Sequence, residues 1–229
     1  MLNRVPQHVS IILTLENDGK RDALEKLVNE VADVAAWCAA AHIPRLSVYE
    51  KTGTSTCIHF SRQLLTAARL GILKRYMNET HRTVSHRLKT WFGKDHTPGL
   101  ALSTRGAPTI RSHGRDYSDE GLEVILVSGD DGREAMVDLT RVLTEMVQKD
   151  KISAKDITMD VIDNELSEAV ISEPDLLISF EPYVDLQGYP PWPIRLTEIY
   201  CAPDNQEVGY QVFLHGLRKY SQATFKLGK

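Results

Sequence analysis

Residues 6–50 read PQHVSIILTLENDGKRDALEKLVNEVADVAAWCAAAHIPRLSVYE, and this stretch predicts the fold. It opens with His8–Thr14, an apolar run rich in Val and Ile that is typical of a strand buried on both faces. Apolar residues then recur at steps of three and four, as on one face of a helix, until Pro44 ends the pattern. Arg45–Glu50 is a second strand. Two such strands joined by a helix form a parallel pair with a right-handed crossover.

The rest of the chain continues this alternation. Further strands are predicted at Leu122–Ser128, Asp175–Phe180 and Ile194–Tyr200. Helices are predicted at 59–92 with a bend or break, at 134–150, after a capping box formed by Ser153 and Asp156, and at 207–223. The fold class is therefore α/β, with a mostly parallel central sheet flanked by helices, and the length allows one large domain or two small ones.

One segment breaks the alternation. Gly93–Ser118 is dominated by Gly, Pro, Ser, Thr, Arg and His, and its apolar residues show no period. This composition predicts a mobile loop.

Composition narrows the class of protein. The chain has 229 residues, 42% hydrophobic and 25% charged, as in ordinary soluble globular domains. Its formal net charge of −4 does not favour nucleic acid as a partner. The three cysteines, Cys38, Cys57 and Cys201, are too scattered for a zinc site and suit a reducing compartment. No apolar run is long enough to span a bilayer, and no signal peptide opens the sequence.

In parallel sheets, ligands collect at the carboxyl ends of the strands, so chemistry is expected at residues 14–19 and 50–54. Glu16, Asp18 and Lys20 could be acid/base groups or metal ligands there, although a solvated loop is the more common role of such residues. The turn Gly129–Arg133 could hold a phosphate at a helix N-terminus. Its two aspartates repel an anion and favour a plain acidic turn. No catalytic triad, Gly-x-Gly-x-x-Gly pattern or P-loop is present.

Several segments, in order, resemble one family: PQHVSIIL, WCAAAHIPRLSVYE, PDLLI, WPIRLTEIY, the strand with its Asp-Gly-Arg turn at Leu122–Arg133, and the terminal KLGK. Together they are similar to the cis-prenyltransferases, and most closely to the accessory, Nogo-B receptor-type subunits of dehydrodolichyl diphosphate synthase. The resemblance covers nearly the whole chain and implies a single domain over residues 1–229 with the fold of that family.

The resemblance also implies a member without catalysis of its own. Active members carry an Asp that binds Mg²⁺ after the first strand, and Thr14 stands there in this chain. They place Ser and Asn after the second strand, where this chain has Glu50-Lys51-Thr52-Gly53. They bind isopentenyl diphosphate with an Arg-rich segment, where Ser179-Phe180-Glu181-Pro182 stands here, with no arginine before Arg195. A neutral hydroxyl is a poor substitute for a carboxylate on a hard cation. We therefore expect no cofactor bound by this chain, and Mg²⁺ at a partner's active site.

In the accessory subunits, a C-terminal Arg-x-Gly motif reaches into the partner's active site. The matching residues here are Lys226, Leu227, Gly228 and Lys229, within a tail at 225–229. Lysine keeps the charge but not the bidentate fork of arginine. The family architecture also places the partner contact in the last third of the fold. The candidates are Trp192, Ile194, Leu196, Tyr210 and Phe213, each of which could equally belong to the core.

The function implied is that of a non-catalytic, activating subunit of the heteromeric synthase that makes dolichol precursors for protein glycosylation. Its partner would be a catalytic cis-prenyltransferase subunit that condenses farnesyl diphosphate with isopentenyl diphosphate. Family members are anchored in the endoplasmic reticulum membrane, facing the cytosol, by an N-terminal segment that we expect to be missing from this sequence. Two alternatives stay open: a self-associating receptor module, which could also be a homodimer in isolation, and a self-sufficient transferase with substitute ligands at Glu16 and Asp18.

Overall fold

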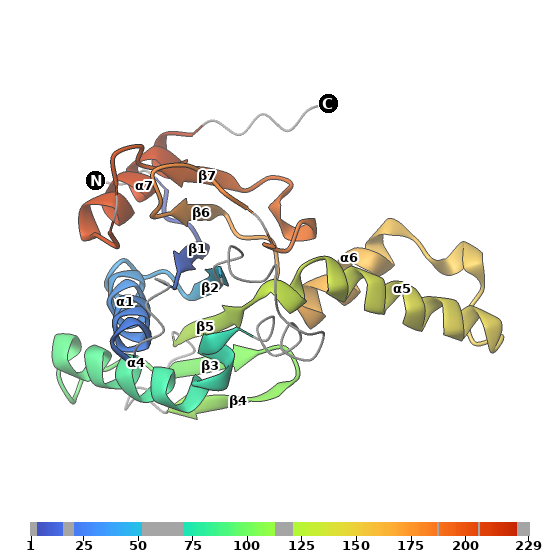
Figure 1. The fold of residues 1–229 in the computed structure, drawn as a ribbon, viewed down its shortest axis with the longest axis horizontal. Coiled ribbons are helices and arrows are strands. Elements are labelled where there is room, and N and C mark those ends of the chain that lie inside the picture. The colour runs from blue at the N-terminus through green and yellow to red at the C-terminus, as the bar shows by residue number, and fades with distance from the viewer. Residues whose placement is uncertain are drawn as a thin grey trace.

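One sheet organises the part of the chain that the structure describes, which comprises residues 4–15, 21–51, 71–112, 121–186, 188–205 and 207–223 of a computed structural model. Its seven strands lie in the order β4-β3-β5-β2-β1-β6-β7 (Figure 1). They are β1 His8–Thr14, β2 Arg45–Lys51, β3 Leu100–Thr104, β4 Ala107–Ser112, β5 Leu122–Val127, β6 Leu176–Ser179 and β7 Glu198–Cys201. Only the β3–β4 pair is antiparallel. The predicted α/β class with a mostly parallel sheet is confirmed.

Residues of the central strand β1 face the two sides of the sheet alternately. Val9, Ile11 and Leu13 point into the main core. That core also contains buried side chains of α1 (Arg21–Ala40), α4 (Met77–Phe92) and α7 (Tyr210–Gln222). Ile12 belongs to a smaller cluster on the other side, with Tyr49, Leu177 and Tyr189. A central strand of this kind is buried on both faces, which is why its sequence is an almost unbroken apolar run.

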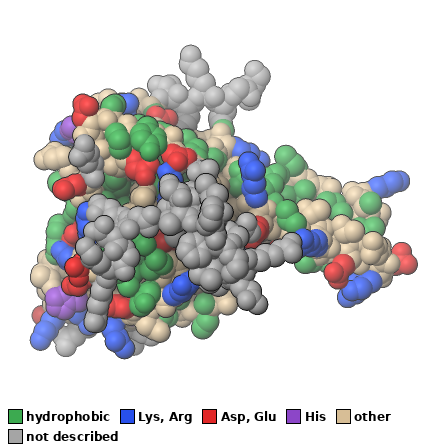
Figure 2. All heavy atoms as spheres, viewed as in Figure 1, with side chains coloured by type: hydrophobic (Ala, Val, Ile, Leu, Met, Phe, Trp, Pro, Cys, Tyr) green, Lys and Arg blue, Asp and Glu red, His purple; other side chains and the backbone are tan. Residues whose placement is uncertain are grey.

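Two helices extend away from the sheet. Figure 1 shows α5 (Arg133–Gln148) and α6 (Met159–Ala169) side by side beyond the carboxyl ends of the strands; we call this pair the α5–α6 arm. Only Ala135 is buried among the residues of α5, whereas Val137 and Val142 are 47% and 54% exposed. Figure 2 shows hydrophobic side chains along the arm. The arm thus presents apolar surface that the sheet does not cover.

The helix predicted at 59–92 with a bend or break is broken at Tyr76 into α3 (Ile72–Arg75) and α4, and residues 59–70 lie outside the described part. Short 3-10 turns account for two differences from the predicted elements. The predicted capping box of Ser153 and Asp156 forms, but it opens the 3-10 turn η3 (Ala154–Asp156), and Thr158 caps α6. Trp192–Ile194 is the 3-10 turn η4, which follows Pro191 and contains Pro193, so β7 begins only at Glu198, four residues later than predicted. A further 3-10 turn, η2, is Gly129–Asp131, shortly after β5.

The loop predicted at Gly93–Ser118 is in part a hairpin. Residues 100–112 comprise β3 and β4, joined by a tight turn with Gly106 at φ 78°, which corrects the prediction there, whereas residues 93–99 form no strand or helix. The burial of Leu100, Leu102 and Thr104 alternates along β3, but the run is only five residues long. Strand β4 lies at the edge of the sheet and exposes most of its side chains, so its polar composition hides it from a periodicity search. Residues 113–118 lie outside the described part.

The buried His8 predicts a pH dependence of stability. Its ring lies 3.0 Å from the Ser47 hydroxyl, and burial, assisted by the charge of Arg45, lowers its pKa to about 3. The folded chain keeps this ring neutral, whereas the unfolded chain protonates it below its ordinary pKa of 6.5. The free energy of unfolding should therefore fall as the pH drops below 6.5, by about 2 kcal/mol at pH 5.

Urea unfolding of the wild-type chain and of the His8→Gln variant between pH 5 and 7 measures this contribution. The variant should lose that part of the pH dependence, whereas His42→Gln, at an exposed position, should keep it. Equal slopes for the wild type and His8→Gln would refute the assignment.

Candidate functional site

The carboxyl ends of the parallel strands define the candidate site. Strand β1 pairs with β2 on one side and β6 on the other, and the chain reaches those neighbours by separate crossovers. Such a switch in strand order is where open α/β sheets bind ligands. The strands end here at Thr14, Lys51 and Ser179, with Val127 at the end of the adjoining β5.

At this edge an ion-pair cluster joins the ends of β1 and β2 to the segment that follows β6. The Lys51 ammonium lies 3.4 Å from Glu181 Oε2 and forms a closer pair with Asp185 Oδ2. The hydroxyl of Thr14 donates to the other oxygen of Glu181. Partial burial alone would lower the pKa of Lys51, but Asp185 and Glu181 outweigh it and the net pKa is raised. The Lys51 ammonium therefore stays charged throughout the neutral range.

The residue before Lys51, Glu50, is buried, and its side chain binds the backbone at the start of α3. Its Oε2 accepts the backbone N–H of Leu73 at 2.9 Å. Burial raises the pKa of this carboxyl despite those backbone donors. The chain approaches it through Gly71 at φ 60°, where an added Cβ would lie 2.7 Å from Cβ of Ser128. The left-handed backbone and this close contact both require glycine.

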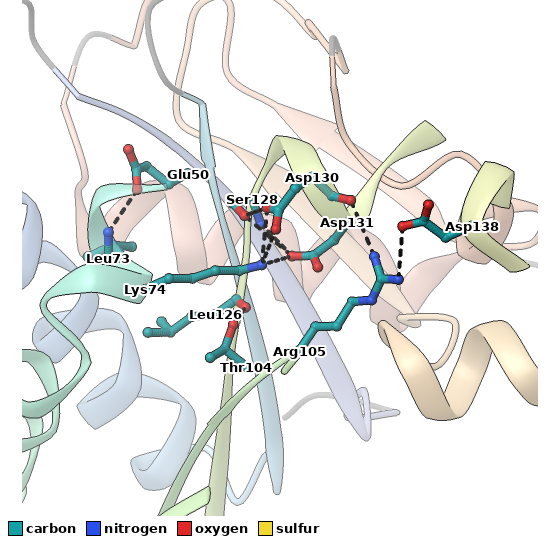
Figure 3. Close-up of polar contacts among 10 residues, drawn as sticks. All are labelled: Glu50, Leu73, Lys74, Thr104, Arg105, Leu126, Ser128, Asp130, Asp131 and Asp138. Carbon is teal, nitrogen blue, oxygen red and sulfur yellow. Dashed lines mark hydrogen bonds and ion pairs between the residues drawn. The ribbon is translucent and has the colours of Figure 1, made fainter. Parts of the chain in front are cut away.

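A second lysine, Lys74, forms ion pairs with the turn that follows β5. Figure 3 shows Lys74 of α3 pointing at the turn after that strand, where its ammonium lies 2.6 Å from Asp131 Oδ2 and 3.1 Å from Asp130 Oδ1. Asp131 is only 2% exposed, and it also accepts the Ser128 N–H at 2.9 Å. Burial raises the pKa of Asp131, and Lys74 offsets part of that shift. Arg105, just after β3, links the same turn to Asp138 of α5 at 3.6 Å (Figure 3).

These contacts decide what the turn Gly129–Arg133 does. Asp130 and Asp131 bind the Lys74 ammonium and the Ser128 groups of their own capping box. The turn is thus the plain acidic turn that the sequence favoured over a phosphate site. Glu16, Asp18 and Lys20, proposed as acid/base groups or ligands, lie outside the described residues, as do Lys226, Leu227, Gly228 and Lys229 of the tail.

The five predicted interface residues fall into two groups. Trp192 and Ile194 lie in η4 beside α6, with Leu196 just after it; the Trp192 indole donates to Asp163 of α6 at 2.8 Å, and Leu196 is 59% exposed. Tyr210 and Phe213 lie on α7 against Trp37 instead. Phe213 is 1% exposed and belongs to the core, which corrects its reading as a partner contact. Whether the other four contact a partner stays a prediction.

Sequence reasoning named Lys51 only as part of a departure from a family pattern and did not name Lys74 or Asp185. A lysine at the end of β2, after the buried Glu50, was the available signal, because a buried charge at that position needs a partner. Lys74 gave no signal, since it lies in a helical pattern where lysine is usually solvated.

Neither a cluster of metal ligands nor a membrane-spanning helix occurs among the described residues. Across the residues described, no group of three or more His, Cys, Asp or Glu side chains is arranged to hold a metal ion. Nor do these residues contain a helix with the length and apolar character needed to cross a membrane.

Comparison with known proteins shows to which family the chain is related. No family model matches the chain. The dehydrodolichyl diphosphate synthase complex subunit nus1 of Schizosaccharomyces pombe is 33% identical over 227 residues, which cover 99% of this chain and 78% of that protein. The chain belongs to the NUS1 family. The NUS1 subunit of Saccharomyces cerevisiae is also 33% identical, over all of this chain, which spans 60% of its length. The family resemblance read from the sequence is confirmed.

The fold agrees with this family. Lavandulyl diphosphate synthase of Lavandula x intermedia, solved with dimethylallyl diphosphate, superposes with a TM-score of 0.63 at 18% identity and covers 98% of this chain and 99% of its own. At that identity the likeness shows the fold alone. This NUS1-family chain therefore has the architecture of a prenyltransferase.

The described residues do not fit the Mg²⁺ that the resemblance to cis-prenyltransferases implies. A divalent ion needs uncommitted carboxylate oxygens beside a diphosphate. Here Thr14 offers a hydroxyl that is bonded to Glu181, and the Lys51 ammonium already pairs with Glu181 and Asp185. We derive no catalytic step through a metal in this chain.

Proposed function

We propose that this chain is the non-catalytic, activating subunit of a heteromeric dehydrodolichyl diphosphate synthase. The observation that carries the proposal is the state of the strand edge, where its own Lys51 and Lys74 hold the carboxylates. The relatives, named as subunits of such a complex, support a partner that performs the chemistry.

The chain would contribute its C-terminal residues to that partner. Gly228 has no Cβ, so its N–H can approach a phosphate oxygen closely. Lys226 and Lys229 add positive charge for the diphosphate of isopentenyl diphosphate. Mg²⁺ and the prenyl substrate would be bound by the catalytic subunit, whose own carboxylates supply the metal ligands.

The α5–α6 arm is the surface we propose for the partner. Its exposed apolar side chains are Val137, Val142 and Met159, and the exposed Leu196 lies just after η4, which contacts α6. Apolar side chains of this kind form the centre of obligate interfaces. We extend the proposal to the location that the resemblance implies, the cytosolic side of the endoplasmic reticulum membrane.

A turnover assay tests the function. The purified chain, given farnesyl diphosphate, isopentenyl diphosphate and Mg²⁺, should form no prenyl product, because it cannot hold the metal between two diphosphates. Addition of a catalytic NUS1-partner subunit should restore product formation, together with a heteromeric mass in light scattering. Robust product formation by the isolated chain would instead support the self-sufficient transferase.

A further inference from the structure

The α5–α6 arm shares little apolar packing with the rest of the chain. Among the side chains described for its two helices, only Ala135 and Leu166 are buried, at 3% and 5% exposed. Ala135 lies in the first turn of α5 and Leu166 near the end of α6, so both are at the base of the arm (Figure 1). Apolar packing therefore attaches the arm at its base but does not fix the direction of its helices.

Three polar side chains join α6 to the turn η4, farther from the base than Leu166. Asp163 Oδ1 accepts the indole N–H of Trp192 at 2.8 Å and a guanidinium N–H of Arg195 at 2.8 Å. The guanidinium carbon of Arg195 also lies 5.5 Å from the centre of the Trp192 ring, within the range of a cation–π contact. We call Asp163, Trp192 and Arg195 the arm clasp. Because both donors share one oxygen, the clasp depends on a single side chain of α6.

The turn η4 is fixed to the sheet by contacts that do not involve the arm. The Thr197 hydroxyl donates to the Pro174 carbonyl at 2.8 Å, just before β6. The backbone N–H of Leu196 donates to the Glu173 carboxylate. The buried Pro193 restricts the backbone of the turn itself. The arm clasp therefore connects the arm to the sheet.

The contacts of α5 with the rest of the chain are longer and lie at its start. Arg105 lies 3.6 Å from Asp138 and 3.5 Å from the Asp130 carbonyl. A Cβ added at Gly132 would lie 2.6 Å from the Gly188 carbonyl oxygen, so this close approach sets the place where α5 begins. The arm clasp acts farther along the arm and through shorter bonds, and we expect it to have the larger influence on the direction of the arm.

We propose that Asp163 is a positioning residue that fixes the direction of the α5–α6 arm, and that association with the partner depends on this direction. The second part rests on the proposed function, in which the arm is the surface for the partner. An arm that samples many directions presents the bound geometry for only a fraction of the time, and its apparent affinity falls by that fraction. An arm that is fixed before association avoids this cost.

Spin labels on the isolated chain measure the direction of the arm. Labels at Glu145→Cys on α5 and Arg82→Cys on α4 occupy exposed positions on the arm and on the helical layer. Cys57 and Cys201 are replaced by Ser in every chain, and the buried Cys38 is kept. The distance between the labels is measured by double electron–electron resonance, and hydrogen exchange of the α6 amides is measured on the same chains.

The wild-type chain should give one narrow distance distribution. Asp163→Ala should broaden it and speed exchange of the α6 amides about tenfold, because hydrogen bonds to a charged group are lost. Asp163→Asn keeps an acceptor oxygen and should give a narrower distribution than Asp163→Ala. Glu165→Ala removes an exposed carboxylate from the middle of the same helix and should change neither measurement. If Asp163→Ala does not fold, Trp192→Phe decides, since it removes one donor and keeps the ring.

Binding of the catalytic subunit, measured by calorimetry, tests the second part. Asp163→Ala should lower the affinity about five- to tenfold. Val142→Glu, which changes the exposed face of the arm, should lower the affinity and leave the distance distribution narrow. A narrow distribution in the folded variant, or full affinity despite a broad one, would overturn the proposal. If the wild-type chain binds no catalytic subunit, the proposed function fails, and the distance distributions still decide whether Asp163 positions the arm.

Discussion

Removal of residues 225–229 is expected to lower the activity of the heteromeric complex about 100-fold, in the range found when one preorganised donor to a developing charge is lost. The reason is that the truncated chain would no longer supply the Gly228 N–H and the lysine charges to the diphosphate. Steady-state turnover of the complex, measured with saturating partner, reports the change. The deletion leaves the described helix α7, which ends at Gln222, intact.

A variant on the arm gives the contrasting result. Val142→Glu places a charge on the exposed apolar face of α5, so it should weaken association with the partner while the isolated chain folds normally. The tail deletion should do the opposite, with unchanged association by light scattering and lost turnover. A tail-deleted chain that supports full activity would refute tail donation.

The second large effect is expected at Lys74. Its side chain is 8% exposed and that of its partner Asp131 is 1% exposed, so Lys74→Met leaves a buried carboxylate without a counter-charge. Breaking a buried pair in this way costs about 3–5 kcal/mol. For a chain of this size the melting temperature should fall by about 10 °C, which differential scanning calorimetry measures.

Two variants serve as controls for Lys74. Lys74→Met combined with Asp131→Asn should recover more than half of the lost stability, because the amide oxygen can still accept the Ser128 N–H without carrying a charge. Lys149→Ala breaks an exposed pair of the same type and should change the melting temperature by less than 2 °C. A loss of similar size in Lys149→Ala would show that burial is not the cause.

The strong elements of this fold could be predicted from the sequence because they are long and apolar. The apolar run of β1 and the spacing of Leu27, Val31 and Val34 in α1 predict the central βαβ unit, and the structure reproduces β1 at the predicted residues. Strand β4 escaped prediction because an edge strand has few buried side chains and hence no apolar period. Pro191 and Pro193 account for the shortened β7, because they form a 3-10 turn with Trp192 and Ile194 in place of the first residues of the predicted strand.

The candidate site was less predictable, for a different reason. The resemblance indicated which family residues are missing at Thr14 and near Glu181. The structure adds that these two side chains bond to each other. The sequence could not show what replaces the missing residues, because Lys51 and Asp185 are distant in sequence and meet only when β2 and β6 flank β1. Lys74 and Asp131 meet in the same way.

The α5–α6 arm has a consequence for how cells must make this protein. Because the arm exposes apolar side chains, a copy of the chain without its proposed partner would expose this surface to chaperones and proteases. Its lifetime would then follow the supply of its partner. On this proposal, the chain should have a shorter lifetime in cells that lack the partner than in cells that make both subunits.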